Sequence, residues 1–224
     1  MAQRLSGNRI LITEADTFMG PVMRDGLNAH GAEIIADERQ LSSSHVANEV
    51  ISDAGELDGL LVNLAAVNPR RDITETSDEA WQEMFDRMVN PLHWIVRAVL
   101  PQMIERKRGK ILVLGSSSGL RMQPNWSSYA TARGTQLTYV KAAAIEVAHH
   151  NVQVNAIAQT FVENPVYFSP DYIKTDELQE RLKSVPLGRL ARPEEEVQLA
   201  TYLLSSESDF IVGQVISFSG GWYM

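Results

Sequence analysis

The stretch that decides the fold is Lys110–Arg133, which reads KILVLGSSSGLRMQPNWSSYATAR. Its first residues, KILVLGS, are a short apolar and β-branched run that ends in Gly and Ser, the pattern of a buried parallel strand. Such a strand delivers Ser116 to the carboxyl edge of a sheet. Tyr129 and Arg133 follow on a predicted helix, four residues apart, so their side chains project from the same side. A strand-end Ser, a helix Tyr and a permanent cation one turn later predict a catalytic base with the groups that orient it.

The rest of the chain alternates between strand patterns and helix patterns. The predicted strands are Arg9–Thr13, Glu33–Ala36, Leu57–Leu64, Lys110–Leu114, Val152–Ile157 and Gln214–Phe218. The predicted helices are Phe18–His30, Val46–Ala54, Ser77–Lys107 (kinked or broken by Pro91 and Pro101), Trp126–His149, Asp176–Lys183 and Pro193–Leu204, and Gln159–Tyr172 is a long loop. This alternation predicts one α/β domain over residues 1–224, a parallel sheet with helices on both faces. Right-handed crossovers bring the strand carboxyl ends to one edge, where ligands bind.

The composition excludes several classes of function. The 224 residues carry 28 acidic and 20 Lys or Arg side chains, a net charge of −8 and a pI of about 5.2, which gives no electrostatic support for binding nucleic acid or anionic membranes. There is no Cys for disulfides or thiolate chemistry, and the His149–His150 pair has no companion ligands, so no metal site is predicted. No apolar run approaches the roughly 20 residues that span a bilayer. The amino-terminal MAQRLSGNRILIT leads into a strand without a signal-peptide core, so we expect a cytoplasmic protein.

The spacing of Ser116, Tyr129 and Arg133 resembles the Ser-x12-Tyr-x3-Lys signature of the short-chain dehydrogenases/reductases, with Arg133 in place of the Lys. That family uses its Lys to hold the nicotinamide ribose and to favour the ionised Tyr. With Arg, the pattern is similar to that of the halohydrin dehalogenases, cofactor-free relatives on the same scaffold. The segments VPLGRLARPEE (185–195) and IVGQVISFSGGW (211–222) resemble the family's carboxyl-terminal part. The resemblance implies a Rossmann-like doubly wound sheet, which by itself does not imply a function.

The glycine-rich loop of the family is changed here. Its T-G-x-x-x-G-x-G pattern corresponds to TEADTFMG, residues 13–20, in which Glu14 and Phe18 replace the first two glycines and only Gly20 remains. Those glycines let the backbone approach a pyrophosphate at a helix amino terminus. Two side chains in the way, with the like charges of Glu14 and Asp16, should weaken dinucleotide binding by several kcal/mol.

Two more parts of the dinucleotide site have gone. The family's N-N-A-G is NLAA at residues 63–66, and its Pro-Gly after the fifth strand is Gln159-Thr160 within NAIAQTFVEN. Asp37 stands where a ribose acceptor would be, but without the glycine loop we interpret it as a solvated strand-end residue. The resemblance therefore implies an enzyme without a cofactor.

The remaining groups suit proton abstraction. A tyrosine has a reference pKa near 10 and is a poor base at neutral pH, but a fixed cation favours its phenolate. Arg does not deprotonate, and its planar fork can orient the phenolic oxygen. Tyr129 can then remove the proton of a substrate hydroxyl while Ser116 hydrogen-bonds that oxygen. With no hydride acceptor, the alkoxide displaces a leaving group on the neighbouring carbon, which gives an epoxide and halide.

The resemblance also implies the halide site. Its residues would be Gln159, Thr160, Phe161 and Val162 after the fifth strand, with Phe18 opposite and Tyr167 and Phe168 on the same loop. Such a site combines backbone N–H groups with an aromatic wall. Phe18 alone would more often be a core aromatic, but its place in the former glycine loop favours the pocket. Ser169 falls where the family would supply another aromatic. Asn90 matches a helix Asn of the dehydrogenase proton relay, or else satisfies backbone at the Pro91 kink.

Three hypotheses follow. The first is a halohydrin dehalogenase, acting on a small haloalcohol or epoxide and halide, in which azide, cyanide or nitrite also open epoxides. The second is an NAD(P)-dependent short-chain oxidoreductase with a degenerate cofactor loop. The third is a non-catalytic sensor or subunit, which the intact Ser116, Tyr129 and Arg133 oppose. By the same resemblance, the two long helices and the Gly220-Gly221 end imply a homotetramer.

Overall fold

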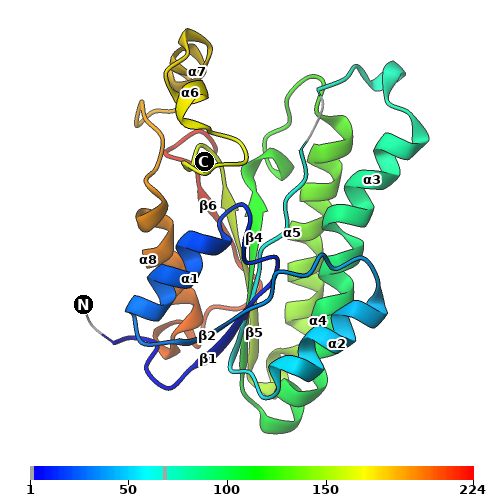
Figure 1. Cartoon of the computed structure of the whole chain (residues 1–224), viewed down its shortest axis with the longest axis vertical. Helices are drawn as coiled ribbons and strands as arrows, with labels where there is room; N and C mark the ends of the chain where they lie inside the picture. The colour runs from blue at the N-terminus through cyan, green and yellow to red at the C-terminus, as the bar shows by residue number, and fades with distance from the viewer. Residues whose placement is uncertain (1–2, 68–69) are drawn as a thin grey trace.

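The six strands of the computed structural model lie parallel in one sheet, in the order β2-β1-β3-β4-β5-β6 (Figure 1). They are β1 Arg9–Ile12, β2 Glu33–Ala36, β3 Gly59–Val62, β4 Gly109–Ser116, β5 Val152–Gln159 and β6 Val215–Phe218. The structure describes residues 3–67 and 70–224, so the first two residues of the amino-terminal stretch lie outside it. The chain runs from β1 outward to β2 and then crosses back to β3, which is the doubly wound order. The predicted α/β fold with a parallel sheet is confirmed.

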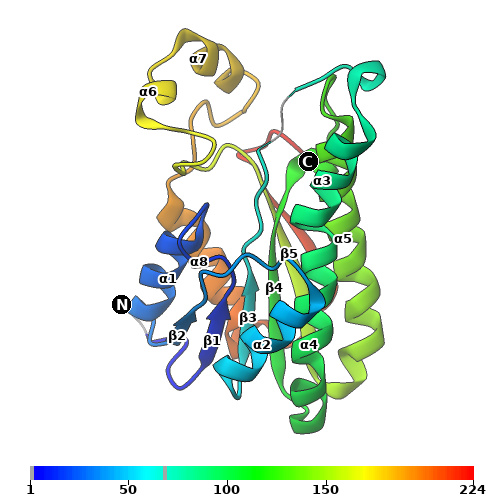
Figure 2. The same ribbon diagram turned by 45° about the vertical axis from the view of Figure 1, so that its right-hand side comes forward.

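Helices cover both faces of the sheet (Figures 1 and 2). On one face lie α1 (Gly20–Ala29) and α8 (Pro193–Leu204), and on the other α2 (Ser44–Ala54), α3 (Asp78–Met88), α4 (Asn90–Arg106) and α5 (Ser127–Val147). Each layer encloses its own buried apolar cluster, because alternate residues of β4 and β5 point to opposite faces. Two short helices, α6 (Pro170–Ile173) and α7 (Asp176–Leu182), stand beyond the carboxyl edge of the sheet.

The long helix predicted over Ser77–Lys107 is two helices, α3 and α4. The break falls at Val89, because Pro91 in the first turn of α4 has no N–H to continue the ladder and its ring crowds the preceding turn. Pro101 lies inside α4 without ending it. Ser77 caps α3, accepting the backbone N–H of Ala80 at 3.2 Å.

β4 and β5 each extend two residues beyond their predicted ends, to Ser116 and Gln159. The two strands pair along their whole length, and Ser116 lies beside Gln159 at the last register position. The sheet thereby places a predicted catalytic residue and a predicted halide-site residue on adjacent strands at its carboxyl edge. Among the described residues, no helix is both long enough and apolar enough to cross a bilayer.

Candidate active site

The three predicted catalytic residues, Ser116, Tyr129 and Arg133, come together where β4 ends and α5 begins. Arg133 is fully buried, and its Nε donates to the phenolic oxygen of Tyr129 at 3.1 Å. Its Nη1 donates to the Leu114 carbonyl at 3.2 Å and to the Gln136 side-chain oxygen at 3.0 Å. The guanidinium is therefore held on two sides, and its Nε is directed at the tyrosine.

Gln136 orients Arg133 from one helical turn further on. Its Oε1 accepts from Arg133, and its Nε2 donates to the Met88 carbonyl at 2.8 Å, where α3 ends. The whole side chain is buried, and both the oxygen and the nitrogen of its amide are hydrogen-bonded. Sequence reasoning missed this residue, although its spacing of three from Arg133 places it on the same helix face.

No carboxylate within the described residues pairs with Arg133. Burial strongly opposes its charge, yet attraction to the oxygens of Tyr129 and Tyr167 outweighs this and raises the pKa of the guanidinium above its ordinary value. Burial raises the pKa of the Tyr167 phenol above its ordinary value of 10. Tyr167 therefore remains a protonated donor at neutral pH, and its hydroxyl donates to the Ala66 carbonyl at 2.9 Å.

The three consecutive serines have different surroundings. Ser117 is fully buried and donates to the Ala158 carbonyl at 2.6 Å, which ties β4 to β5. Ser116 accepts from the backbone N–H of Ser118 at 3.1 Å, and both of these serines line the cavity beside Tyr129. Because the Ser117 hydroxyl is committed to the sheet, Ser116 is the serine that the strand end presents to a ligand.

A cavity of about 360 Å³ opens between the triad and the loop after β5. Its lining includes these sequence-predicted residues: Ser116, Tyr129, Arg133, Phe18, Gln159, Thr160, Val162, Tyr167 and Phe168. The ring of Phe18 meets that of Tyr167 edge to face, with centroids 5.5 Å apart. Gln159 is 5% exposed, and neither its amide oxygen nor its nitrogen has a partner among the described residues. The cavity therefore combines apolar aromatic walls with unsatisfied polar atoms.

Phe161 does not line this cavity, contrary to its predicted place in the halide site. Its backbone is left-handed, with φ +55°, which turns the side chain away from its neighbours in the loop. The ring is buried against Trp222, with centroids 6.0 Å apart. Phe161 therefore supports the cavity wall from behind, where it also lies 6.3 Å from the ring of Phe168.

The loop between β1 and α1 keeps left-handed backbone at two positions where the family has glycine and this chain does not. Glu14 and Phe18 both adopt left-handed backbone, at φ +44° and +53°. Asn63 holds this loop by donating to the carbonyls of Glu14 at 2.9 Å and Thr17 at 3.0 Å. At Gly20 a Cβ would lie 2.5 Å from the Ala15 carbonyl oxygen, which explains why this glycine remains.

The Glu14 carboxylate is buried between α3 and the segment after β2, where it accepts from the backbone N–H of Leu41 at 3.5 Å. Its side chain is 4% exposed and lies 3.4 Å from Nη2 of Arg87 on α3. Burial raises the pKa of this carboxyl, and the charge of Arg87 opposes the rise. Two positions at which the family has glycine therefore carry side chains here, and one of these side chains is a buried carboxylate.

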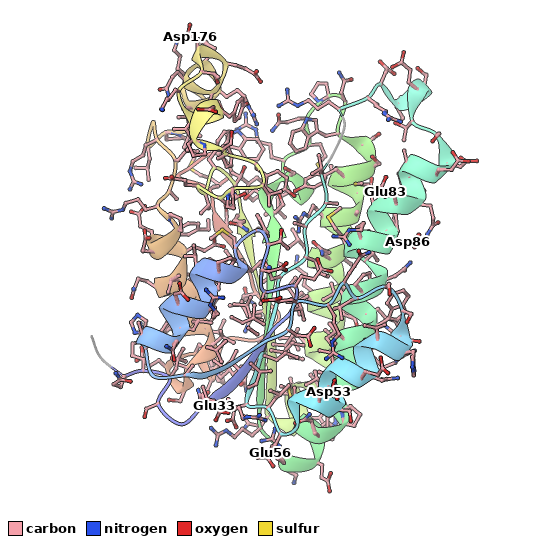
Figure 3. All side chains as sticks on the ribbon, in the orientation of Figure 1. Glu33, Asp53, Glu56, Glu83, Asp86 and Asp176 are labelled. Atoms are coloured by element: carbon pink, nitrogen blue, oxygen red, sulfur yellow. The ribbon has the colours of Figure 1, made fainter. Side chains whose placement is uncertain are left out.

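Two further residues of the former cofactor site have local partners. Asp37 pairs with Arg39 at 2.6 Å, and only 12% of its side chain is exposed, so it is not the solvated residue that the sequence suggested. The side chain of Asn90 has a partner on α3, because its Nδ2 donates to Asp86 at 2.8 Å (Figure 3).

Sequence reasoning missed several cavity residues, among them Trp126. Its ring packs edge to face on Tyr129, with centroids 5.3 Å apart, and it precedes Tyr129 by three positions at the start of α5. The other missed residues are Val67, Arg70, Gly115, Ser118, Asn164, Val166, Tyr172 and Arg181. Tyr172 and Arg181 lie on the short helices α6 and α7, and Val67, Arg70, Asn164 and Val166 lie in loops whose conformation has no short-range signature.

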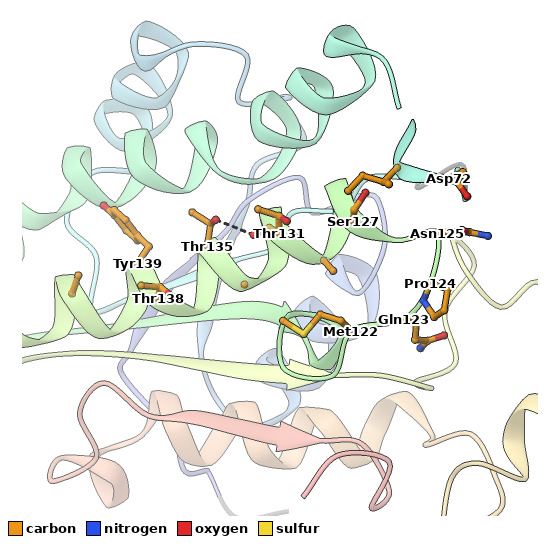
Figure 4. Close-up of a pocket in the computed structure, with 14 residues that line it drawn as sticks. Asp72, Met122, Gln123, Pro124, Asn125, Ser127, Thr131, Thr135, Thr138 and Tyr139 are labelled. Carbon is orange, nitrogen blue, oxygen red and sulfur yellow. Dashed lines mark hydrogen bonds between the residues drawn. The ribbon is translucent and has the colours of Figure 1, made fainter. Parts of the chain in front are cut away.

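A second, larger hollow of about 930 Å³ runs along the outer side of α5 (Figure 4). Small side chains line it, including Thr131 and Thr135, whose hydroxyl donates to the Thr131 carbonyl at 2.8 Å. None of the triad lines this hollow. Its size therefore does not make it the candidate active site. Within residues 3–67 and 70–224 no group of three or more His, Cys, Asp or Glu side chains could hold a metal ion.

Comparison with known proteins identifies the family to which the chain belongs. A family model described as enoyl-(acyl carrier protein) reductase matches residues 29–223. The 3-oxoacyl-(acyl-carrier-protein) reductase FabG of Thermotoga maritima is 30% identical over 216 residues, which cover 94% of this chain and 81% of that protein.

Solved structures superpose over almost the whole chain. One described as a dehalogenation enzyme has 26% identity and a TM-score of 0.91, and the match covers 98% of this chain and all of the other. A gluconate 5-dehydrogenase from Burkholderia cenocepacia, solved with NADP and tartrate, has 23% identity and a TM-score of 0.90, over 98% of this chain and 96% of that one, and shows the fold alone. The chain belongs to the short-chain dehydrogenase/reductase superfamily.

Proposed function

We propose that the protein is a halohydrin dehalogenase, which converts vicinal haloalcohols into epoxides and halide and catalyses the reverse ring opening. One observation carries the proposal: the buried Arg133 guanidinium hydrogen-bonds the Tyr129 oxygen in a cavity whose far wall is Phe18, a side chain in a former glycine loop. The structural match to a dehalogenation enzyme supports it.

The proton transfer falls to Tyr129. Its oxygen accepts from Nε of Arg133 at 3.1 Å and, as the catalytic base, takes the proton of the substrate hydroxyl. The Ser116 hydroxyl donates to the substrate oxygen and holds it for this transfer. The alkoxide then attacks the neighbouring carbon: an oxygen–carbon bond forms, the carbon–halogen bond breaks, and its electron pair leaves with the halide. The proton stays on Tyr129 until it passes to solvent.

The departing halide would lie between Phe18, Tyr167 and the end of β5. Aromatic ring edges carry partial positive charge and suit a weakly hydrated anion. The unpartnered Gln159 Nε2 is a donor already buried in this cavity, and an anion would satisfy it. Azide, cyanide and nitrite are also small monovalent anions, and they should open epoxides from the same halide site.

The second candidate function, an NAD(P)-dependent oxidoreductase, is favoured by the sequence similarity to FabG. Glu14 and Phe18 oppose it, because a pyrophosphate would meet a buried carboxylate where the family has glycine. We further propose that the enzyme needs no cofactor, works in the cytoplasm and forms a homotetramer through α4, α5 and the Gly220-Gly221 end.

The test is chloride and bromide release from a panel of vicinal haloalcohols, with no nucleotide added. Wild-type protein should release halide and form epoxide, whereas Tyr129→Phe should be nearly inactive. If the protein instead reduces carbonyl compounds with added NADPH and releases no halide, the second candidate function is supported and the first is refuted.

A further inference from the structure

The cavity beside Tyr129 is lined by arginine and by no acid. Arg70 and Arg181 line it together with the buried Arg133, and the described lining includes no Asp, Glu or Lys. The chain as a whole carries a net charge of −8, so the cavity is opposite in sign to the rest of the molecule. A concave site of one charge sign concentrates ligands of the other sign.

Arg70 is held over an aromatic ring. It belongs to the segment between β3 and η1 (Ile73–Glu75), and its guanidinium carbon lies 5.5 Å from the centroid of the Trp126 ring. Trp126 in turn packs on Tyr129. Stacking of this kind fixes the plane of a guanidinium and leaves the N–H groups at its edge free to bind. Trp126 thereby keeps the charge of Arg70 near the reacting end of the cavity.

Arg181 reaches the cavity from α7. Its guanidinium carbon lies 5.6 Å from the centroid of the Phe161 ring, and its Nη1 donates to the Tyr172 hydroxyl at 2.7 Å. This bond uses one of five donors. Arg181 on α7 and Arg70 in the segment between β3 and η1 line the same cavity from parts of the chain that lie far apart in sequence.

Neither arginine has a carboxylate partner within the described part of the chain. By contrast, nine arginines elsewhere do: Arg4, Arg9, Arg24, Arg39, Arg87, Arg106, Arg108, Arg189 and Arg192. Acidic residues are present on α7, but Asp176 lies at its outer end (Figure 3), and Glu177 accepts from Tyr172 without lining the cavity. Two fork-shaped donors that converge on a cavity without a counter-charge are suited to an anion brought by the ligand.

We propose that the preferred substrate is a small haloalcohol, or its epoxide, that carries a carboxylate bound between Arg70 and Arg181. The inference rests on the proposed function and names its substrate class. The reacting hydroxyl meets Tyr129 and Ser116, and the carboxylate passes through the reaction unchanged. A cavity of about 360 Å³ suits a molecule of this size. We choose a carboxylate over a phosphate because phosphate sites add a nest of glycine-rich backbone N–H groups, whereas the described lining has only Gly115.

The experiment compares two substrates that differ at one carbon, 3-chloro-2-hydroxypropanoate and 3-chloropropane-1,2-diol. Wild-type protein should favour the acid by kcat/KM for chloride release. Arg70→Gln and Arg181→Gln should each lower the ratio of acid to diol by about 10-fold, the scale of one charge-assisted hydrogen-bonded pair. Arg24→Gln removes the same charge from the exposed side of α1 and should leave the ratio within about twofold, as a change in net charge alone predicts.

The outcomes separate this inference from the proposed function. Chloride release from the diol, with the same acid-to-diol ratio in wild type and in both glutamine variants, overturns the carboxylate site and leaves the dehalogenase standing. If neither substrate releases chloride, the proposed function fails, and calorimetry with glycerate and glycerol decides the site. If wild-type protein binds glycerate but not glycerol, and Arg70→Gln and Arg181→Gln no longer bind glycerate, the carboxylate site is supported. If glycerate and glycerol bind equally, or neither binds, the carboxylate site is overturned. Circular dichroism confirms that each variant is folded.

Discussion

Replacing Glu196 by glutamine should stabilise the protein, and by more at high pH than at low pH. Glu196 lies in the first turns of α8 with no exposed surface, and neither carboxylate oxygen has a hydrogen-bond partner among the described residues. Burial raises the pKa of this carboxyl from 4.5 to about 8. Between these two pH values the folded protein holds a proton that the unfolded chain releases. The contribution of this protonated carboxyl to stability is therefore fully present below pH 4.5 and is lost as the pH rises through 8.

The size of the effect follows from those two values. One pKa unit corresponds to about 1.4 kcal/mol, so the cost that Glu196 imposes on folding is about 1.4 kcal/mol at pH 5.5 and about 4 kcal/mol at pH 8. Glutamine has the same shape and no charge to ionise. The free energy of unfolding of Glu196→Gln should therefore exceed that of wild type by about 3 kcal/mol more at pH 8 than at pH 5.5.

Urea unfolding followed by circular dichroism at both pH values measures this difference. Glu194→Gln is the matched control, because it removes a carboxylate from the exposed side of the same helical turn. The control should show little pH dependence. If the difference between Glu196→Gln and wild type is the same at pH 5.5 and pH 8, the carboxyl does not titrate inside the fold and the reasoning fails.

Three other predictions concern the site and the assembly. Arg133→Lys keeps a charge but loses the planar fork that hydrogen-bonds the tyrosine, Leu114 and Gln136, so kcat for halide release should fall by about 10²-fold; an unchanged kcat would mean that Arg133 does not orient the base. Titration with NAD(H) and NADP(H) should give no micromolar binding, because Glu14 and Phe18 stand at two glycine positions of the family's loop; saturable binding in calorimetry would contradict this. Light scattering should find a homotetramer, and Ile145→Asp, on an α5 side chain that is 82% exposed, should split it into smaller species; a wild-type monomer at micromolar concentration would refute the assembly.

The parts of the fold that follow from short-range patterns could be predicted from the sequence. Six apolar strand runs between helices of sufficient length leave few topologies besides a doubly wound sheet. The triad was predictable for the same reason, since Ser116 ends a strand and Tyr129 and Arg133 share a helix face. The extra length of β4 and β5 depends on their mutual pairing, which a single strand's pattern does not contain.

The cavity walls depend on contacts between distant segments. Phe161 was assigned to the halide site from its position in the chain, but its left-handed backbone and its packing on Trp222 send the ring elsewhere. Arg70, in the segment after β3, and Arg181, on α7, are far apart in sequence and line one cavity only because the fold brings these segments to the same edge of the sheet. Phe18, by contrast, was predictable as a cavity residue, because the turn that it occupies has a fixed place at the end of β1.

The most direct test of the central claim measures halide and epoxide together, from nucleotide-stripped protein acting on 1,3-dichloropropan-2-ol. The mechanism predicts equal amounts of chloride and epoxide with no cofactor present. It also predicts a loss of about 10²–10⁴-fold in Tyr129→Phe, because the proton acceptor held at 3.1 Å by Arg133 is gone. Chloride release that is undiminished in Tyr129→Phe, or that appears only when a nicotinamide nucleotide is added, would contradict it.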